Sequence, residues 1–396
     1  MASLLLAIIY LAFISLGLPD SLLGSAWPEM HQTLGVPLSA MGIATTLISV
    51  GTVISSLLSD KLTSKFSTPI VVATSVGLTA VGLIGFSFAP TFAVLCVFAI
   101  PYGLGAGSID AALNNYVALH YTSRHMSWLH CFWGVGAVVS PYVMSYALGS
   151  KMGWSGGYRI VGGIQIVILV ILIATLPIWK KSGHTVPVNE EEAANRQSAG
   201  LIKSLKIRGV PYVLLGFLGY CAAESTVMVW ASTYFFEAKS TTEEVAAALG
   251  SLFFIGMTVG RFFSGFITNR VGDKNMIRAG LAISAMGVVI IAVATSLPIS
   301  IVGFLLIGLG FAPVYPSIIH STPASFGAEN SQAIIGIQMA SAYLGATLAP
   351  PAFGLIANYV DVRLMPLYLA VFMLVCFVML ELLNRQAKEK MANNEN

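Results

Sequence analysis

The sequence predicts an all-α integral membrane protein, in which twelve transmembrane helices form two pseudo-symmetric six-helix bundles. Three observations support this fold: the scarcity of charge, the number of long apolar stretches and an internal repeat. Of the 396 residues, 56% are hydrophobic and only 9% are charged, whereas soluble globular proteins carry about 25% charged residues. So few charges cannot build the surface of a soluble protein. The composition therefore argues against a water-soluble enzyme, a nucleic-acid-binding protein and a disordered chain.

Twelve apolar stretches are long enough to cross a bilayer, which takes about 20 residues of α-helix. Backbone groups in hydrocarbon must satisfy their own hydrogen bonds, and the stretches are too uniformly apolar for barrel strands, so we expect helices. The first stretch has no basic leader region and no clear cleavage site, and we expect it to be retained. The predicted spans are 3–27, 38–59, 68–89, 92–118, 127–150, 157–179, 210–236, 244–268, 276–297, 298–320, 331–358 and 363–384.

One polar stretch, Lys180–Arg208, interrupts this pattern after the sixth span. We predict that its Leu201–Ile207 part forms a short amphipathic helix on the membrane surface. The predicted domains are an N-terminal bundle, a cytoplasmic linker and a C-terminal bundle, with the boundaries 1–180, 181–208 and 209–396.

The basic residues predict the orientation of the chain in the membrane. If the N-terminus is cytoplasmic, fifteen of the 20 Lys and Arg residues lie in cytoplasmic segments, four lie in outer segments and one lies within a span. Cytoplasmic loops of membrane proteins carry such an excess of positive charge. We therefore expect a multi-pass protein of the cytoplasmic (inner) membrane, with both termini and the linker in the cytoplasm.

Three short sequence matches in the same order indicate that the six-helix unit is duplicated. Parallel six-span repeats are typical of transporters that bind substrate between the halves, near the middle of the membrane. The matches are SLLSDKLTSK with GFITNRVGDK (Ser56–Lys65 and Gly265–Lys274, offset 209), GAVVSP with GATLAP (Gly136–Pro141 and Gly345–Pro350, offset 209), and GLGAGSID with GLGFAPVY (Gly103–Asp110 and Gly308–Tyr315, offset 205).

Three acidic residues lie within predicted spans: Asp20, Asp110 and Glu224. A carboxylate at the centre of a bilayer costs about 2.5–3.5 kcal/mol, so such residues are rare and are candidates for function. Without a partner or water they tend to take up a proton, and a group that does so on alternate sides couples proton flow to transport. We predict that these three acids couple protons, and that Glu224 also contacts substrate. The alternative is a structural hydrogen bond between helices.

Other polar and aromatic residues of the spans form the predicted substrate site. Asn114 lies one turn after Asp110 and offers both a donor and an acceptor for hydroxyl groups. His130 binds substrate hydroxyls or joins a proton relay with Asp110, with a packing histidine as the alternative. The two tryptophans stack on a sugar ring, unless they serve as packing or interface residues. The full predicted set is Asn114, His130, Trp133, Glu224, Trp230 and Gln338.

Charged residues in the short loops after the second and eighth spans are predicted to form a cytoplasmic gate. Such charges at helix ends can pair across the two halves and hold the inner side closed, and Arg261 is predicted to join them. The alternative is that these charges only set the topology. The predicted gate residues are Asp60, Lys61, Lys65, Arg261, Asn269, Arg270 and Asp273.

The two charged loops, D-K-x-x-x-K and N-R-x-G-D-K, resemble the cytoplasmic signature of the major facilitator superfamily. In the first copy, Ser56 and Thr63 stand where the family usually has glycine. Within the superfamily, the sequence resembles the fucose permease branch of hexose–proton symporters. That branch has an Asp in span 1, a G-x-G-x-x-E-T-A-A-N stretch in span 4 and a Q-x-F-x-x-x-G-A stretch in span 5.

In this sequence, IDAALN corresponds to the end of the family's span 4 stretch, and HCFWGVGA corresponds to its span 5 stretch. The resemblance implies a proton-coupled sugar transporter of the major facilitator fold. It also implies that Asp20 and Asp110 are the proton-linked acids and that Asn114 and His130 contact the sugar. Glu is replaced by Asp at 110, and Gln by His at 130.

We therefore predict a secondary transporter, not an enzyme, that moves a monosaccharide or a similar polar small molecule with protons by alternating access. The alternatives are a proton-driven exporter of drugs or other amphipathic molecules, a non-transporting receptor, and a transporter of organic anions. An anion transporter would need a cation in the cavity, and Arg261 lies near the predicted cytoplasmic end of its span. We expect a monomer without cofactor, metal or nucleic acid, with Na⁺ as the alternative coupling ion.

Overall fold

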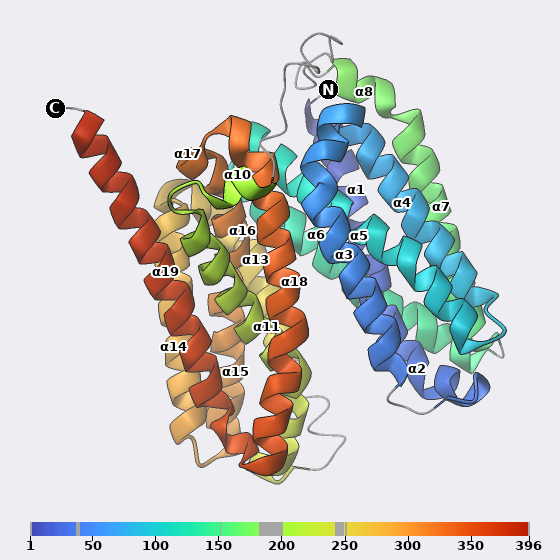
Figure 1. Ribbon diagram of the computed structural model, residues 1–396. Helices are drawn as coiled ribbons and strands as arrows, with labels where there is room; N and C mark the ends of the chain where they lie inside the picture. The colour runs from blue at the N-terminus through green and yellow to red at the C-terminus, as the bar shows by residue number, and fades with distance from the viewer. Residues whose placement is uncertain are drawn as a thin grey trace. The chain divides into compact units, whose positions relative to one another are not determined.

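The computed structural model describes residues 2–36, 40–150, 152–181, 201–241, 249 and 252–394. Within these ranges, every regular element is a helix (Figure 1). The elements are α1 (Ala2–Asp20), α2 (Leu22–Thr33), α3 (Met41–Phe66), α4 (Thr68–Ser87), α5 (Phe92–His120), α6 (Ser123–Gly149), α7 (Gly153–Ala174), α8 (Leu176–Lys181), α10 (Leu201–Leu205), α11 (Val210–Lys239), α13 (Leu252–Val271), α14 (Asp273–Val293), α15 (Leu297–Phe311), α16 (Val314–His320), α17 (Thr322–Phe326), α18 (Ala328–Tyr359), the 3₁₀ helix η2 (Val362–Leu364) and α19 (Met365–Asn394).

Eleven segments of the described chain are helical, long and apolar enough to cross a membrane. Each corresponds to one of the predicted spans, including a first span that runs through α1 and α2. The predicted span 244–268 corresponds to α13, which the structure describes from Leu252 on and which carries Arg261; this described part is not among the eleven. The charged guanidinium of Arg261 lowers the mean hydropathy of the described part. With α13 included, the helices follow the predicted order of twelve.

The chain divides into two compact units, whose boundaries differ from those of the predicted domains. The residues Val117–Trp128, at the end of α5 and the start of α6, belong to the second unit. Most of the predicted linker, residues 182–200, lies outside the described residues, and α10 covers part of the predicted short helix. The first unit comprises Met1–Tyr116 and Leu129–Gly200, and the second comprises Val117–Trp128 and Leu201–Asn396.

Each unit is built from long helices that pack along one another. In the first unit, α4 packs along α7. In the second unit, α11 packs along both α18 and α19, and α15 packs on both α13 and α14 (Figure 1). Small residues allow these close approaches, as is usual between helices in membranes.

Matching glycines in the two units support the predicted duplication. A Cβ atom added to Gly103 of α5 would lie 2.3 Å from the carbonyl oxygen of Ile48 in α3. A Cβ atom added to Gly308 of α15 would lie 2.3 Å from the carbonyl oxygen of Phe253 in α13. Both members of the second pair lie 205 positions after those of the first. The two helix pairs therefore approach each other in the same way.

The same comparison corrects the predicted alignment of the two charged segments, which used an offset of 209. The corner between α3 and α4 is Ser67, and the corner between α13 and α14 is Gly272, 205 positions later. Both residues have a positive φ, 68° and 80° respectively. An error of four residues is close to one helical turn, so it leaves every side chain near its correct face and the sequence pattern cannot detect it.

The first charged segment was also predicted to be a loop, and that prediction was wrong. Asp60, Lys61 and Lys65 all lie within α3, which continues to Phe66. The polar segment forms the last two turns of the helix, because helices commonly extend beyond the apolar core of a bilayer. The second segment was likewise predicted to be a loop, but Asn269 and Arg270 lie in the last turn of α13 and Asp273 begins α14.

Candidate functional site

The first span breaks at Asp20, the last residue of α1. The preceding residue, Pro19, has no N–H to donate to the carbonyl of Ser15, four residues earlier. That carbonyl instead accepts a hydrogen bond from Nε2 of Gln165 in α7. A side chain from another helix thus satisfies a backbone group that proline leaves unpaired, as the interior of a membrane requires.

A second proline produces a matching contact on the other side of the break. Pro141 of α6 cannot donate to the carbonyl of Ala137, and the hydroxyl of Ser21 donates to it instead. The hydroxyl of Ser140 lies 2.9 Å from that of Ser21. Because Ser21 uses its one proton for Ala137, Ser140 is the donor in the second contact. Both sides of the Asp20 break are therefore held by side chains of the first unit.

The carboxylate of Asp20 is held by one of the predicted substrate residues. Nε1 of Trp133 in α6 donates a hydrogen bond of 2.7 Å to Oδ2 of Asp20. The side chain of Asp20 is exposed, and that of Trp133 is partly exposed. The structure therefore brings together a predicted proton-coupling acid and a predicted aromatic contact.

Asp110, Asn114 and His130 form a hydrogen-bonded line inside the first unit. Nδ2 of Asn114 donates to Oδ1 of Asp110 at 2.7 Å and to the backbone carbonyl of Asp110 at 3.0 Å. Oδ1 of Asn114 lies 3.0 Å from Nε2 of His130. Since the amide oxygen can only accept, the Nε2 atom of His130 carries the proton. The three side chains are 5%, 0% and 5% exposed, respectively.

This line has a direction: hydrogen bonds are donated from His130 to Asn114 and from Asn114 to Asp110. The ring of His130 also packs edge-on against Phe13 of α1, with ring centroids 5.4 Å apart. The sequence predicted that Asn114 shares a face with Asp110, and the two hydrogen bonds between these residues agree. It did not predict the bond from His130 to Asn114, because α5 and α6 meet only in the folded unit.

In the second unit, the predicted acid Glu224 pairs with Arg261. Nη2 of Arg261 in α13 lies 3.3 Å from Oε1 of Glu224 in α11, and the two side chains are only 6% and 13% exposed. Tyr220, one turn before Glu224, donates its hydroxyl to the carbonyl of Phe311, where α15 ends. The contact with Glu224 places Arg261 inside the helical bundle. The structural pairing considered for Glu224 is the arrangement observed.

The remaining two predicted substrate residues are engaged in contacts within the second unit. Oε1 of Gln338, which is 0% exposed, accepts a hydrogen bond of 3.0 Å from Thr322. Trp230 donates its Nε1 to the carbonyl of Pro350 at 2.9 Å and packs edge-on against Phe353. Contact of Gln338 and Trp230 with substrate stays a prediction.

Two predicted gate residues contact the connection between α5 and α6, which belongs to the second unit. Oδ1 of Asn269 accepts a hydrogen bond of 3.2 Å from the backbone N–H of Arg124. The carboxylate of Asp273 accepts one hydrogen bond from Ser123 and lies 2.6 Å from Nδ1 of His320. Ser123 and His320 are not among the residues predicted from the sequence to form the gate.

Comparison with known proteins identifies the family. The family model described as Major Facilitator Superfamily matches residues 9–242 and 213–395. The chain belongs to the major facilitator superfamily. A curated relative, an uncharacterized transporter from Sinorhizobium fredii, is 26% identical over 348 residues, which cover 85% of this chain and 87% of the relative. The protein is therefore a multi-pass membrane transporter of this superfamily, which is a family of transporters and not of enzymes.

Solved structures of superfamily members share the fold. The Escherichia coli fucose:proton symporter has a TM-score of 0.75 and 17% identity, covering 95% of this chain and 98% of the symporter. A proton:xylose symporter has a TM-score of 0.77 and 14% identity, covering 96% of this chain and 95% of the symporter. A human organic anion transporter has a TM-score of 0.76 and 13% identity, covering 94% and 98%. The predicted major facilitator fold is confirmed.

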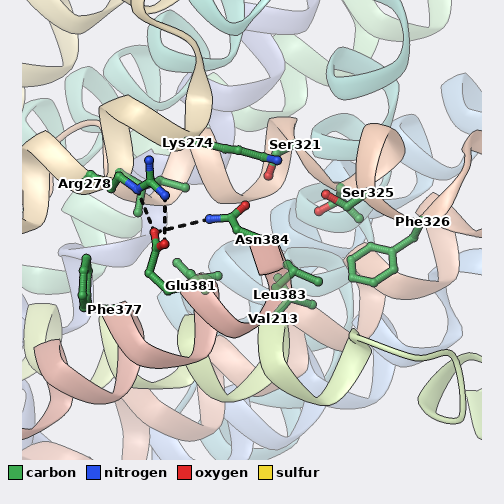
Figure 2. Close-up of a pocket in the computed structure, with 13 residues that line it drawn as sticks. Val213, Lys274, Arg278, Ser321, Ser325, Phe326, Phe377, Glu381, Leu383 and Asn384 are labelled. Carbon is green, nitrogen blue, oxygen red and sulfur yellow. Dashed lines mark hydrogen bonds and ion pairs between the residues drawn. The ribbon is translucent and has the colours of Figure 1, made fainter. Parts of the chain in front are cut away.

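This superfamily member has a small pocket in its second unit (Figure 2). Its walls come from α11, α14, Ser321, α17 and α19 of the second unit, and Arg278 binds Glu381 there through two hydrogen bonds of 2.7 and 2.8 Å. Figure 2 shows Asn384 on the other side of the Glu381 carboxylate. None of the predicted proton-coupling or substrate residues lines this pocket, and we do not assign it to transport.

Proposed function

We propose that this protein is a proton-coupled transporter that moves a monosaccharide or a similar polar small molecule by alternating access. The observation that carries the proposal is the line His130–Asn114–Asp110, in which a buried carboxylate ends a chain of hydrogen-bond donors. Two structural neighbours are a fucose:proton symporter and a proton:xylose symporter, which supports the same class of substrate and ion. Both acids of the first unit, Asp20 and Asp110, take part in the proposal.

The proposed coupling follows from the strength of the bond between Asp110 and Asn114. A carboxylate accepts a charge-assisted hydrogen bond that is about twice as strong as one to a neutral acceptor. When Asp110 takes up a proton, its hold on the amide of Asn114 weakens. Asn114 and His130 then become free to exchange their mutual bond for bonds to substrate hydroxyl groups. Proton binding and sugar binding thereby favour each other.

The proposed role of Asp20 differs, because its side chain is exposed while Asp110 is buried. Its partner Trp133 offers an indole face of the kind that stacks on the apolar side of a sugar ring. A proton on Asp20 weakens the bond from Trp133 and releases the indole for stacking. Glu224 is held by Arg261, so we assign it a secondary role in coupling.

Counterflow in proteoliposomes tests this proposal. Purified protein is reconstituted into vesicles loaded with an unlabelled compound, and entry of the labelled compound is followed for a panel of neutral sugars and polyols. We expect at least one sugar to exchange, and an inward proton gradient to drive its accumulation. His130→Phe should abolish sugar exchange, whereas His125→Phe, a matched change in the first turn of the same helix, should not.

Two outcomes would contradict the proposal. If no sugar exchanges, the proposed substrate class is wrong. If sugar uptake does not respond to the proton gradient, the proposed proton coupling is wrong. Efflux of amphipathic dyes that is blocked by Asp20→Asn would favour the alternative of a proton-driven exporter.

One observation favours a second candidate, the transport of organic anions. The sequence argues against anions because Arg261 lies near the predicted cytoplasmic end of its span, but in the structure Arg261 contacts Glu224 within the bundle. A protonated Glu224 would release the guanidinium for a carboxylate of the substrate, and one neighbouring structure is named as an organic anion transporter. Organic anions therefore belong in the same counterflow panel. Exchange of an anion that Arg261→Gln abolishes would support this candidate.

A further inference from the structure

The connection between α5 and α6 is fastened to the other helices of the second unit. The backbone N–H of Arg124 donates to Asn269, and its Nε donates to the carbonyl of Gly265 at 3.1 Å. The ring of Trp128 packs edge-on against Phe266, with centroids 5.5 Å apart. These contacts place the connection against the end of α13.

The same connection meets His320, the last residue of α16, through both nitrogens of the imidazole ring. Nδ1 lies 2.6 Å from Oδ2 of Asp273, and Nε2 lies 3.2 Å from the backbone carbonyl oxygen of Tyr121. The other carboxylate oxygen of Asp273 accepts a hydrogen bond from Ser123. His320 and Asp273 thus bind the connection at two of its residues.

Both partners of the His320 ring are acceptors, and this fixes the number of protons that the ring needs. A neutral imidazole carries one N–H and one lone pair, so it can donate to only one of the two oxygens. The lone pair would then face the other oxygen and repel it. Only the doubly protonated ring satisfies both the Asp273 carboxylate and the Tyr121 carbonyl.

The helix ends around this pair favour the same charge state. Asp273 lies in the first turn of α14, where the helix dipole favours a negative charge. His320 ends α16, where the dipole favours a positive charge. Other ionisable groups on the elements that meet at this position include His120, Tyr121, Arg124, His125, Arg270, Lys274, Arg278, Tyr315 and Glu329.

We propose that His320 is a proton-binding site separate from the transport acids, and that its doubly protonated ring latches the α5–α6 connection to α14 and α16 of the same unit. On loss of one proton, the ring keeps only one of its two hydrogen bonds and the latch weakens. The predicted orientation places this site on the cytoplasmic side, so the latch responds to cytoplasmic pH. It tightens when the cytoplasm is acidic and loosens when it is alkaline. The inference does not depend on which compound the protein transports.

Hydrogen–deuterium exchange of the full-length protein in lipid nanodiscs tests this latch. Exchange of peptides that cover residues 117–128 is measured at about pH 5 and about pH 8, which bracket the ordinary titration of histidine. The variants are His320→Gln, which cannot take up a proton, and His320→Arg, which keeps a positive charge with several donors. His125→Gln is the matched control, because His125 lies in the same connection and its ring is 5.6 Å from that of Tyr121. All proteins are compared at equal pH, so that the intrinsic pH dependence of exchange cancels.

At the acidic pH, we expect exchange in His320→Gln to be about tenfold faster than in the wild type, a factor that corresponds to about 1.4 kcal/mol. At the alkaline pH, this difference should nearly disappear. His320→Arg should stay slow at both pH values, and His125→Gln should follow the wild type.

Three results would overturn the proposal. One is a difference between the wild type and His320→Gln that is the same at both pH values. Another is fast exchange of His320→Arg at acidic pH. The third is loss of the pH dependence in His125→Gln, which would assign the proton to His125 instead.

Discussion

The carbonyl of Ser15 offers a direct test of how the Asp20 break is held. Pro19 removes the backbone donor that would normally bind this carbonyl, and Gln165 replaces it. Gln165→Leu keeps the size of the side chain but removes the donor. Pro19→Ala restores a backbone N–H at position 19, which can donate to the carbonyl of Ser15 in a continuous helix.

The expected effect of Gln165→Leu therefore depends on the residue at position 19. Hydrogen bonds between helices in membranes are worth on average about 0.6 and at most about 1.7 kcal/mol in double-mutant cycles. The Ser15 carbonyl loses its backbone donor to proline, so we expect a value near the upper limit, about 1–1.5 kcal/mol. Oε1 of Gln165 is buried and accepts no hydrogen bond from the described residues, so its removal offsets part of the loss in the single variant.

A double-mutant cycle cancels the contribution of the buried Oε1 atom, because this atom is removed both with Pro19 and with Ala at position 19. The free energy of unfolding is measured by detergent titration for the wild type, Gln165→Leu, Pro19→Ala and the double variant. We expect Gln165→Leu to cost about 1–1.5 kcal/mol more with Pro19 than with Ala at position 19. Costs that agree within about 0.5 kcal/mol, the usual error of additivity, would refute the proposed replacement of the backbone donor.

Two further predictions concern the second unit and the repeat. Arg261→Gln or Glu224→Gln alone should lower the free energy of unfolding by about 3 kcal/mol, since each leaves a charge in a poorly solvated place, and the double variant should be more stable than either. A double variant that is destabilised by the sum of the two single effects would contradict this prediction. Gly103→Ala and Gly308→Ala should each destabilise by about 1–3 kcal/mol, because each methyl group would lie 2.3 Å from a carbonyl oxygen. Gly163→Ala is the control, because its methyl group would meet no atom within 4 Å. Thermal unfolding measures the three variants. A large difference between the destabilisation by Gly103→Ala and that by Gly308→Ala would contradict the duplicated packing.

The sequence predicted the helical fold well, because each span is a long apolar stretch and the bilayer allows few alternatives. It also predicted the face shared by Asp110 and Asn114, since that depends only on helical periodicity. The 209-residue offset was wrong by about one turn at the corners Ser67 and Gly272, because a shift of one turn preserves the pattern of faces. Local periodicity cannot separate such alternatives.

The partners of Asp20 and Glu224 could not be predicted in the same way, because they come from other helices. Nothing near Glu224 in the sequence indicates that Arg261 would reach it. The roles of Gln165 and Ser21 are a partial exception. Proline within a span leaves a carbonyl without its donor, so each such proline predicts that some polar side chain must replace it.

Uptake driven by a proton gradient in Asp110→Asn vesicles tests the central claim most directly. Asparagine cannot take up and release a proton, so we predict that uphill accumulation is lost while exchange of labelled for unlabelled substrate continues. Glu29→Gln, which changes an exposed acid of α2 in the same unit, should accumulate substrate like the wild type. Unchanged uphill accumulation by Asp110→Asn would contradict the assignment of proton coupling to this residue.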